Sequence, residues 1–443
     1  MHSLSGRRGL TRLAVGAALI GLLTTACSSS SKSSTSAGGS SSAGNTASAP
    51  GITATQITIG SHQPLTGPAA PGYSEIAPAA NAYFQWVNDH GGINGRKIVY
   101  KYLDDGYNPA MTTSVVRQLV LQDNVFAIFN GLGTPTHLAV RDFLNTEKVP
   151  DLFVASGCTC WNDAAKAPYT FGWQTDYTVE GQIEGQYVAQ TLAGKKVGYF
   201  VQNDDFGSNG AKGLDMQIKA SDVVSRQTYV TSNINVQPQI EALQSAGAQV
   251  AVLYSVPAFT ALALLTAAKL NYHPTWVVSN VGSDPTTLAG LLQNFSKGAA
   301  GASLAEGIIT DSYAAPIGDT TNPWAQLFKQ IHDKYIPSLP LDGNVAYGFG
   351  AAYTFVAALV AAGKNPTRDG IVKAIQNSHF GGPGLVPFSY SATNHQGYSG
   401  TQMATIKSGA VVLQGTPFTA TDTGGIKAYT TPPATPPANG IPS

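Results

Sequence analysis

From about residue 56 onward, short apolar runs alternate with longer stretches of helical character. Runs such as 57–61 and 125–129 predict strands, and intervening stretches such as 75–89 predict helices. Strands that alternate with helices form parallel sheets covered by helices on both faces. The series breaks near residue 175 and starts again with a strand at 196–202. We therefore expect an α/β protein with two doubly wound parallel-sheet lobes.

The first 50 residues have a different character. Three arginines precede an apolar run at 13–23 and the small residues before Cys27, which predicts a secretory signal peptide over 1–26. The run is shorter than the ~20 residues that span a bilayer. A cysteine at this place resembles the lipobox of bacterial lipoproteins, with Thr24 where that motif usually has leucine, and the resemblance implies lipidation of Cys27. A plain signal peptide cut near Ala26 and an uncleaved anchor are the alternatives.

The rest of the N-terminal region and the overall charge set further limits. The Ser/Gly/Ala-rich tract that completes 27–50 predicts a flexible linker. The 25 basic and 25 acidic residues give a net charge of zero, which argues against nucleic acid as a partner because phosphate binding needs a basic surface. The apolar stretch at 351–362 is short and has helical spacing, so we expect a core helix there.

The other two cysteines, Cys158 and Cys160, are one residue apart. On an extended chain their side chains point to opposite faces, so a disulfide needs a tight local bend. A local disulfide and two free thiols are both open. No second cysteine pair or paired histidines supply further ligands, so we expect no metal site. No catalytic motif is present, and we expect no catalytic residues and no cofactor.

One segment carries a family resemblance. Residues 82–97 read AYFQWVNDHGGINGRK, in which a helix ends at a glycine pair and a turn leads into a strand. This string resembles the signature of the leucine/isoleucine/valine-binding protein family, the type 1 periplasmic solute-binding proteins of ABC transporters. The segments PLTGP at 64–68 and QNDDFG at 202–207 fit the same family. The resemblance spans about residues 52–415.

The resemblance implies the type 1 periplasmic binding fold, two lobes joined by a hinge with three chain crossings. We expect these crossings near 174–176, 309–311 and 387–389. Lobe one then combines 52–174 with 311–387, and lobe two combines 175–310 with 388–430. The proline-rich tail at 431–443 is expected to be extended or disordered.

The resemblance also implies pocket residues in the loops that follow the strands, where open α/β sheets bind ligands. Tyr73 stands where the family has an aromatic residue over the ligand. Thr134, with Thr136 next, is the candidate hydroxyl for a ligand carboxylate, because a helix begins there and its free N–H groups favour an anion. Capping of that helix by Thr134 is an alternative that is compatible with ligand contact. Ser156 or Gly157 is expected to offer backbone contacts.

In the second lobe the expected ligand contacts are Phe206, Ser255, Asn280 and Val281. Val281 falls where amino-acid binders of the family place an acidic residue against the ligand ammonium. A buried ammonium without a carboxylate is costly. The sequence therefore favours a small ligand with an acid or amide group and an apolar or aromatic body, unless another acid such as Asp284 reaches the site.

Together these features predict an extracytoplasmic solute-binding protein, not an enzyme. It is expected to hold a small amino acid, amide or organic acid between its lobes, to deliver it to ABC permease subunits, and to be tied to the outer face of the membrane through lipid on Cys27. A ligand sensor of the same fold, signalling to a membrane partner, is the alternative function.

Overall fold

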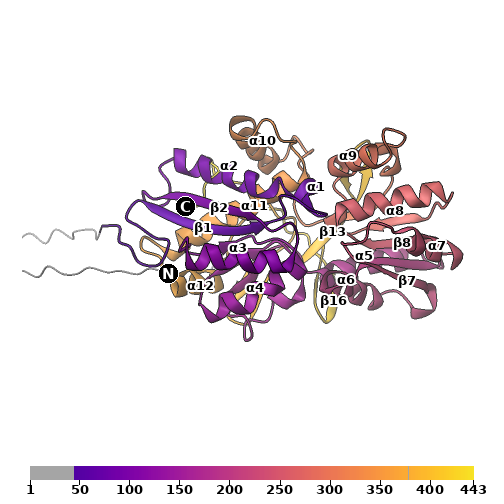
Figure 1. Cartoon of the computed structure of the whole chain (residues 1–443), viewed down its shortest axis with the longest axis horizontal. Coiled ribbons are helices and arrows are strands. Elements are labelled where there is room, and N and C mark those ends of the chain that lie inside the picture. Colours follow the sequence, from indigo (N-terminus) through magenta and orange to yellow (C-terminus); the bar gives the residue numbers. More distant parts are fainter. Residues whose placement is uncertain (1–43, 378) are drawn as a thin grey trace, which may run out of the picture. The chain divides into compact units, whose positions relative to one another are not determined.

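A computed structural model of the chain describes residues 44–443 except Ser378. The predicted signal peptide and Cys27 lie outside the described residues. The described part holds two large sheets, each flanked by helices (Figure 1). We call the part of the chain that packs on the five-stranded sheet the first lobe, and the part that packs on the nine-stranded sheet the second lobe.

The sheet of the first lobe is entirely parallel, in the order β2-β1-β3-β4-β5. Its strands are β1 (Gln56–Gln63), β2 (Lys97–Asp104), β3 (Ile128–Phe129), β4 (Asp151–Val154) and β5 (Thr170–Gly172). Its helices are α1 (Ala70–Tyr73), α2 (Ile76–Asp89), α3 (Pro109–Leu121), α4 (Thr134–Thr146), α10 (Pro323–Tyr335), α11 (Gly343–Ala362) and α12 (Arg368–Asn377), with a short 3₁₀ turn at Thr159–Trp161.

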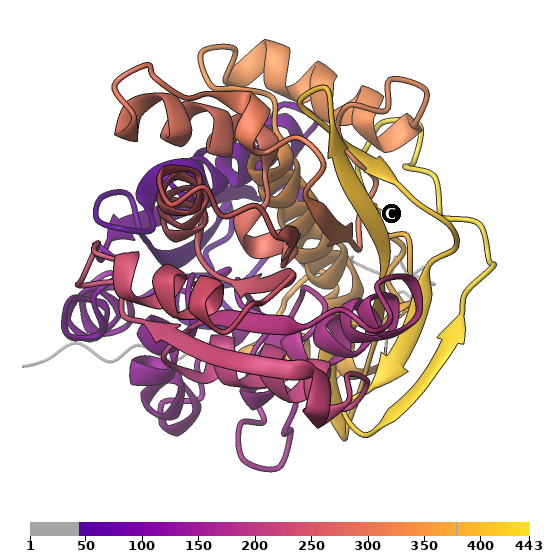
Figure 2. The ribbon, with the colours of Figure 1, turned by 90° about the vertical axis from the view of Figure 1, so that its right-hand side faces the viewer.

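The second lobe repeats this pattern and then adds antiparallel strands. Strands β7-β6-β8-β9-β10 are parallel, and β13 joins β10 antiparallel, followed by β15 and β16. The strands are β6 (Val197–Gln202), β7 (Val223–Tyr229), β8 (Val250–Tyr254), β9 (Thr275–Val278), β10 (Ile309–Ser312), β13 (Gly400–Lys407), β14 (Ala410–Leu413), β15 (Phe418–Thr421) and β16 (Gly424–Ala428). The helices are α5 (Tyr177–Thr191), α6 (Asp205–Asp215), α7 (Gln237–Ser245), α8 (Pro257–Lys269) and α9 (Pro285–Phe295). The predicted α/β class with two parallel-sheet lobes is thus confirmed, and Figure 2 shows the antiparallel strands (yellow) along one side of the second lobe.

Helix α11 is the central helix of the first lobe. Among the described helices, α11 alone is long and apolar enough to cross a membrane. However, 72% of the residues in its most apolar 18-residue stretch are buried inside the protein. It packs against α2, and its apolar side chains belong to the same core as the first sheet. The prediction of a core helix at 351–362 is therefore confirmed.

The chain passes between the lobes after β5 and after β10, close to the first two predicted crossings. Strands β11 (Phe388–Ser391) and β12 (Asn394–Tyr398) form a separate hairpin that packs into the first core. The third passage therefore lies between β12 and β13, about ten residues later than expected. The tail then returns to the first lobe, where Tyr83 Oη donates to the Gly440 carbonyl at 2.7 Å.

Candidate ligand-binding site

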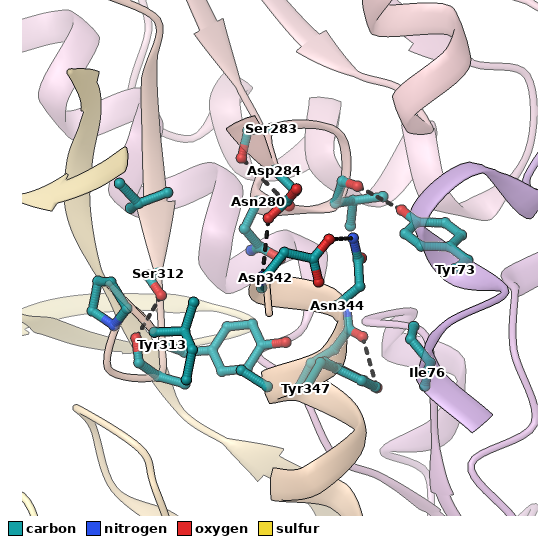
Figure 3. A pocket seen from close by; sticks show the side chains of 18 of the residues that line it. Tyr73, Ile76, Asn280, Ser283, Asp284, Ser312, Tyr313, Asp342, Asn344 and Tyr347 are labelled. Atoms are coloured by element: carbon teal, nitrogen blue, oxygen red, sulfur yellow. Dashed lines mark hydrogen bonds between the residues drawn. The ribbon is translucent and has the colours of Figure 1, made fainter. Parts of the chain in front are cut away.

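A cavity of about 300 Å³ lies between the two lobes, and both contribute to its walls. Many of its residues lie in the segments that follow strands, at the carboxyl ends where open α/β sheets bind ligands. Figure 3 shows Tyr73 and Tyr347 from the first lobe and Asn280 and Asp284 from the second around the same space. The arrangement lets a small molecule touch both lobes at once.

Five of the residues predicted from the sequence line this cavity: Tyr73, Thr134, Phe206, Asn280 and Val281. The other four lie behind its wall. Thr136 donates its hydroxyl hydrogen to the Leu132 carbonyl at 2.6 Å, and the Ser255 hydroxyl pairs with Thr260 at 2.7 Å. Ser156 supports Thr134 through a hydroxyl contact of 2.7 Å, while a side chain at Gly157 would meet the Thr175 carbonyl at 2.5 Å. Strand-end position alone does not tell which way each side chain points.

The start of α4 offers an uncapped helix N-terminus to the cavity. Its N-cap residue is Gly133, with no side-chain cap, so Thr134 does not cap the helix. Gly133 has φ +103°, and a Cβ there would meet Thr136 Oγ1 and the Tyr107 ring at 2.5 Å each, so glycine is required. The Thr134 N–H and hydroxyl are donors at this end of α4, whereas Pro135 has no N–H, and a helix N-terminus favours a negatively charged partner.

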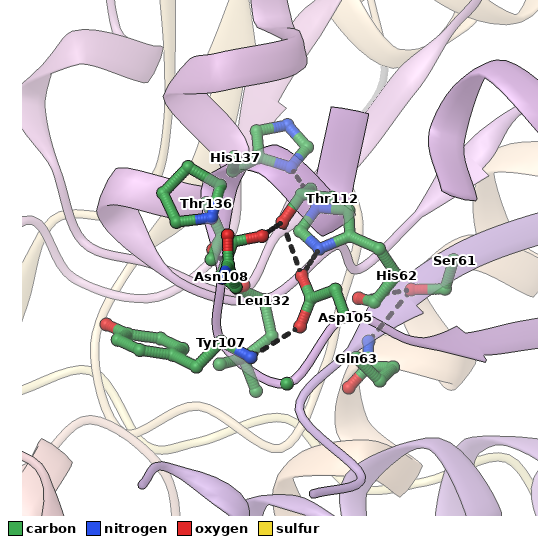
Figure 4. A network of polar contacts seen from close by, with 12 residues as sticks. Ser61, His62, Gln63, Asp105, Tyr107, Asn108, Thr112, Leu132, Thr136 and His137 are labelled. Atoms are coloured by element: carbon green, nitrogen blue, oxygen red, sulfur yellow. Dashed lines mark hydrogen bonds and ion pairs between the residues drawn. The ribbon is translucent and has the colours of Figure 1, made fainter. Parts of the chain in front are cut away.

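A fully buried chain of four side chains lies beneath this loop, and Figure 4 labels three of them, Asp105, His62 and His137. Asp105 contacts His62 Nδ1 at 2.8 Å, His62 Nε2 contacts His137 Nδ1 at 2.9 Å, and His137 Nε2 contacts Asp151 at 2.8 Å. Each of these three hydrogen bonds needs one hydrogen atom between its two heavy atoms. Two neutral imidazole rings carry one N–H hydrogen each, so the chain needs one hydrogen more than they supply. Burial lowers the pKa of His62, and the hydrogen bond that His62 donates to Asp105 opposes this shift. A Cβ on Gly131 would lie 2.5 Å from His62 Nε2, so the loop rests directly on this network.

Aromatic side chains that the sequence did not single out make much of the remaining wall: Tyr107, Trp173, Tyr177, Tyr313 and Tyr347. The Trp173 ring lies 4.8 Å from the Tyr347 ring and 6.0 Å from the Tyr313 ring. These residues come from four separate segments, so no local motif connects them. They give the cavity an apolar, aromatic character suited to the body of an organic ligand.

The charged residues of the cavity are all acidic. Asp284, Asp311 and Asp342 line it, and no lysine, arginine or histidine of the described residues does. Glu75 stands next to Asp342, and burial, followed by the charges of Asp342 and Asp284, raises the pKa of Glu75 to about 8. Burial raises the pKa of Asp342 to about 6. Asp311 lies inside β10 and not after a strand, which is why strand-end reasoning missed it.

Hydrogen bonds between described residues join the two lobes at the cavity, and three of them take both partners from opposite walls or their supports. Tyr73 Oη donates to the Val281 carbonyl at 2.5 Å, and the Gly343 N–H donates to Asp284 Oδ2 at 3.0 Å. Asn344 Nδ2 donates to Thr287 Oγ1 at 3.1 Å. Each pair takes one member from each lobe, so separating the lobes breaks all three.

Of the two arrangements left open for the cysteine pair, the structure has a disulfide between Cys158 and Cys160. Both residues belong to the segment after β4, in which the Cys158 N–H donates to the Ser156 hydroxyl at 3.2 Å. The disulfide therefore lies next to the Thr134–Ser156 pair, outside the cavity wall.

Two α/β lobes with a cavity between them, bridged by side chains from both, define a protein that encloses a small molecule. Residues 56–410 match the periplasmic binding protein family, and the chain belongs to this family. The match confirms the resemblance seen in the sequence. The match also confirms the prediction that the chain is a binding protein and not an enzyme. Periplasmic binding proteins work outside the cytoplasm.

Relatives and solved structures agree with this assignment. The chain is 26% identical over 210 residues to Leu/Ile/Val-binding protein homolog 3 of Brucella melitensis, covering 44% of this chain and 53% of that protein. It is 24% identical over 336 residues to homolog 1 of Brucella abortus, covering 72% and 82%. The chain thus spans about half the length of the first of these relatives.

Two solved structures have closely similar folds. A fatty acid ABC transporter substrate-binding protein from Thermomonospora curvata has a TM-score of 0.73 at 24% identity, covering 84% of this chain and 95% of that one. A branched chain amino acid ABC transporter protein from Thermus thermophilus with bound valine has a TM-score of 0.72 at 21% identity, covering 83% and 97%. At these identities the likeness concerns the fold and not the ligand.

Proposed function

We propose that this protein is the solute-binding component of an ABC importer and captures a small organic molecule by closure of its two lobes. The observation that carries the proposal is the cavity of about 300 Å³ with walls from both lobes. A ligand that contacts both lobes binds the closed form better than the open form, so it shifts the population toward closure. A permease that recognises the closed lobes then receives only loaded protein.

The ligand proposed is a small amino acid, amide or organic acid with an apolar or aromatic body. Its acid or amide oxygen lies at Thr134 and the start of α4, and its body lies among the aromatic rings of the wall. The absence of an acid at Val281 argued against a ligand with an ammonium group. Asp311, on the second-lobe side of the cavity, offers such a group a carboxylate partner. Free amino acids therefore belong in any screen beside acids and amides.

A thermal-shift screen tests this function. Amino acids, their amides, aromatic acids and neutral aromatic compounds are added singly to the purified protein, since a ligand that binds only the folded state raises its melting temperature. We expect at least one class to raise it in proportion to the logarithm of its concentration. The effect should be lost when Tyr347 is replaced by alanine. A ligand that still binds with unchanged affinity to that variant would place binding outside the cavity and contradict the proposal.

We further propose that lipid on Cys27 holds the protein at the outer face of the membrane. The support is the sequence alone, namely the signal-like segment at 1–26 and the cysteine that follows. Cys27→Ala should move the protein from the membrane fraction to the soluble fraction of cells. Unchanged membrane retention would refute lipid anchoring at this residue.

The alternative, a sensor of the same fold, uses the same cavity and the same closure. The two functions differ in what recognises the closed lobes, so uptake of the identified ligand separates them. Loss of ligand uptake on deletion of the gene supports import, whereas retained uptake with a lost transcriptional response supports sensing.

A further inference from the structure

Three carboxylates meet inside the second lobe, directly behind the cavity. Glu180 and Glu184 lie one turn apart on α5, and Asp311 projects from β10. One carboxylate oxygen from each lies within 4.8 Å of the other two. The exposed fractions are 0% for both glutamates and 2% for Asp311. No spacing in the sequence pointed to this group, because Asp311 is more than 120 residues away from the glutamates along the chain.

The hydrogen bonds around the group leave it incomplete. Tyr254 Oη donates to Glu184 Oε2 at 2.7 Å, and the Asn280 side-chain amide donates to Glu180 Oε1 at 2.8 Å. The remaining oxygens Glu180 Oε2 and Glu184 Oε1 are buried and have no partner. A buried carboxylate oxygen without a donor is costly. Two members of the group therefore each have a buried oxygen that no protein donor satisfies.

No positive side chain compensates the group. Among the described residues, no lysine, arginine or histidine forms an ion pair with Glu180, Glu184 or Asp311. The three acids thus lie within 4.8 Å of one another with no cationic side chain of the described residues paired to them.

We propose that Glu180, Glu184 and Asp311 bind a divalent cation of the calcium class in the second lobe. The donors are all oxygens, which suits Ca²⁺ or Mg²⁺ and not zinc or copper. Two ligands on opposite sides of Ca²⁺, at roughly 2.3–2.6 Å each, lie about 4.6–5.2 Å apart, whereas around Mg²⁺ they lie about 4.1 Å apart. The three oxygens lie within 4.8 Å of one another, a limit that fits ligands placed on opposite or adjacent sides of Ca²⁺.

The surroundings supply the rest of such a site. Asp311 and Asn280 line the cavity, so an ion and its waters have a path from solvent. Turning the Asn280 amide by 180° would present its oxygen to the ion, adding a fourth protein ligand. Thr401 Oγ1 donates to Asp311 Oδ2 at 2.5 Å and holds that carboxylate in place, as outer partners of metal ligands do.

The ammonium group of an organic ligand would fit the three carboxylates less well than an inorganic cation. Only Asp311 of the three faces the cavity, and Glu180 and Glu184 lie behind it. An ammonium held in the cavity would therefore pair with Asp311 and leave both glutamates unpartnered. An inorganic ion is small enough to reach all three carboxylates.

The test uses CaCl₂ alone, on the purified chain after treatment with EDTA and dialysis. We expect one Ca²⁺ per chain by isothermal titration calorimetry, with a dissociation constant in the range of about 10⁻⁴–10⁻³ M that weaker extracellular sites have. Glu184→Gln and Asp311→Asn should each weaken binding at least tenfold. Glu241→Gln, the same change at an exposed site on α7 of the same lobe, should leave binding unchanged.

Terbium luminescence locates the ion without depending on the acid variants. Tb³⁺ replaces Ca²⁺ and is excited through nearby tyrosine, and Tyr254 touches Glu184. Tyr254→Phe should lower the sensitised emission, and added calcium should still displace Tb³⁺ from that variant. No calcium binding up to 10 mM, an equal response to NaCl at matched ionic strength, or binding that survives both acid variants would each overturn the proposal. Failure of any solute to bind in the thermal-shift screen would not affect this result.

Discussion

The hydroxyl of Tyr73 gives the sharpest test of closure, because it reaches from the first lobe to the second. It donates to the Val281 carbonyl at 2.5 Å, and the tyrosine is 9% exposed. Tyr73→Phe removes this bond and keeps the ring. A neutral hydrogen bond contributes a net 0.5–1.5 kcal/mol or so, and each 1.4 kcal/mol or so is a factor of ten. The ratio of closed to open protein should therefore fall about 2- to 13-fold.

Since the competent form is the closed one, the apparent dissociation constant for the solute found by the screen should rise by at most that factor. Isothermal titration calorimetry measures it. Tyr169→Phe is the matched control, because its hydroxyl bonds to Asp369 at 2.5 Å within the first lobe. A loss above about 100-fold would mean that the hydroxyl contacts the solute itself. An unchanged constant would mean that this bond does not contribute to closure.

Three further outcomes follow from the site. Thr134→Val should weaken binding of a carboxylate ligand by about 1–3 kcal/mol. Thr136→Val should leave binding unchanged, because the Thr136 hydroxyl already donates to the Leu132 carbonyl. Equal losses of affinity for the two variants in calorimetry would contradict this geometry. The folded state keeps Glu75 protonated up to about pH 8, whereas the unfolded chain releases that proton near pH 4–5. Between these two pH values the folded state therefore binds more protons than the unfolded chain. The free energy of unfolding should then fall as the pH rises from about 4–5 to about 8. Urea unfolding should show a flatter profile for Glu75→Gln than for the unaltered protein, and parallel profiles would refute the assignment. His62→Phe should lower the free energy of unfolding by about 3 kcal/mol, because it leaves the buried Asp105 carboxylate without its imidazole donor. His273→Phe, the same change at an exposed histidine, is the control. Equal losses of stability in the two variants would argue against the buried network.

The alternation of strands and helices was readable from the sequence because parallel strands buried on both faces are apolar throughout. Strand β8 (Val250–Tyr254) is an example, with every residue buried. Strand β12 (Asn394–Tyr398) was not predicted, since its sequence NHQGY has no apolar run or alternation. Its position depends on tertiary contacts, such as the stacking of His395 on Phe171 at 3.8 Å, which no local pattern reports.

The same distinction applies to the site. Residues directly after strands, such as Thr134 and Asn280, could be predicted because the fold brings strand ends together. Asp342 and Asn344 could not, because they lie at the start of α11, which reaches the cavity only after the chain has returned to the first lobe. The loop of Val281 has no acid at the family's usual position, and the acids that line the cavity include Asp311 in β10 and Asp342 before α11, which come from other segments.

The proline-rich tail shows how composition and contacts differ in what they determine. Its repeated prolines disfavour helix and strand interiors, and the described tail has neither helix nor strand beyond β16. Yet aromatic side chains of the first lobe bind its backbone, with Trp324 Nε1 donating to the Ala434 carbonyl at 2.6 Å and Trp86 Nε1 to the Asn439 carbonyl at 3.0 Å. Since β16 belongs to the second lobe, the tail is a fourth link between the lobes. The six steps from Ala428 to Ala434 can span only about 20 Å, so wider opening has to break the Trp324 bond.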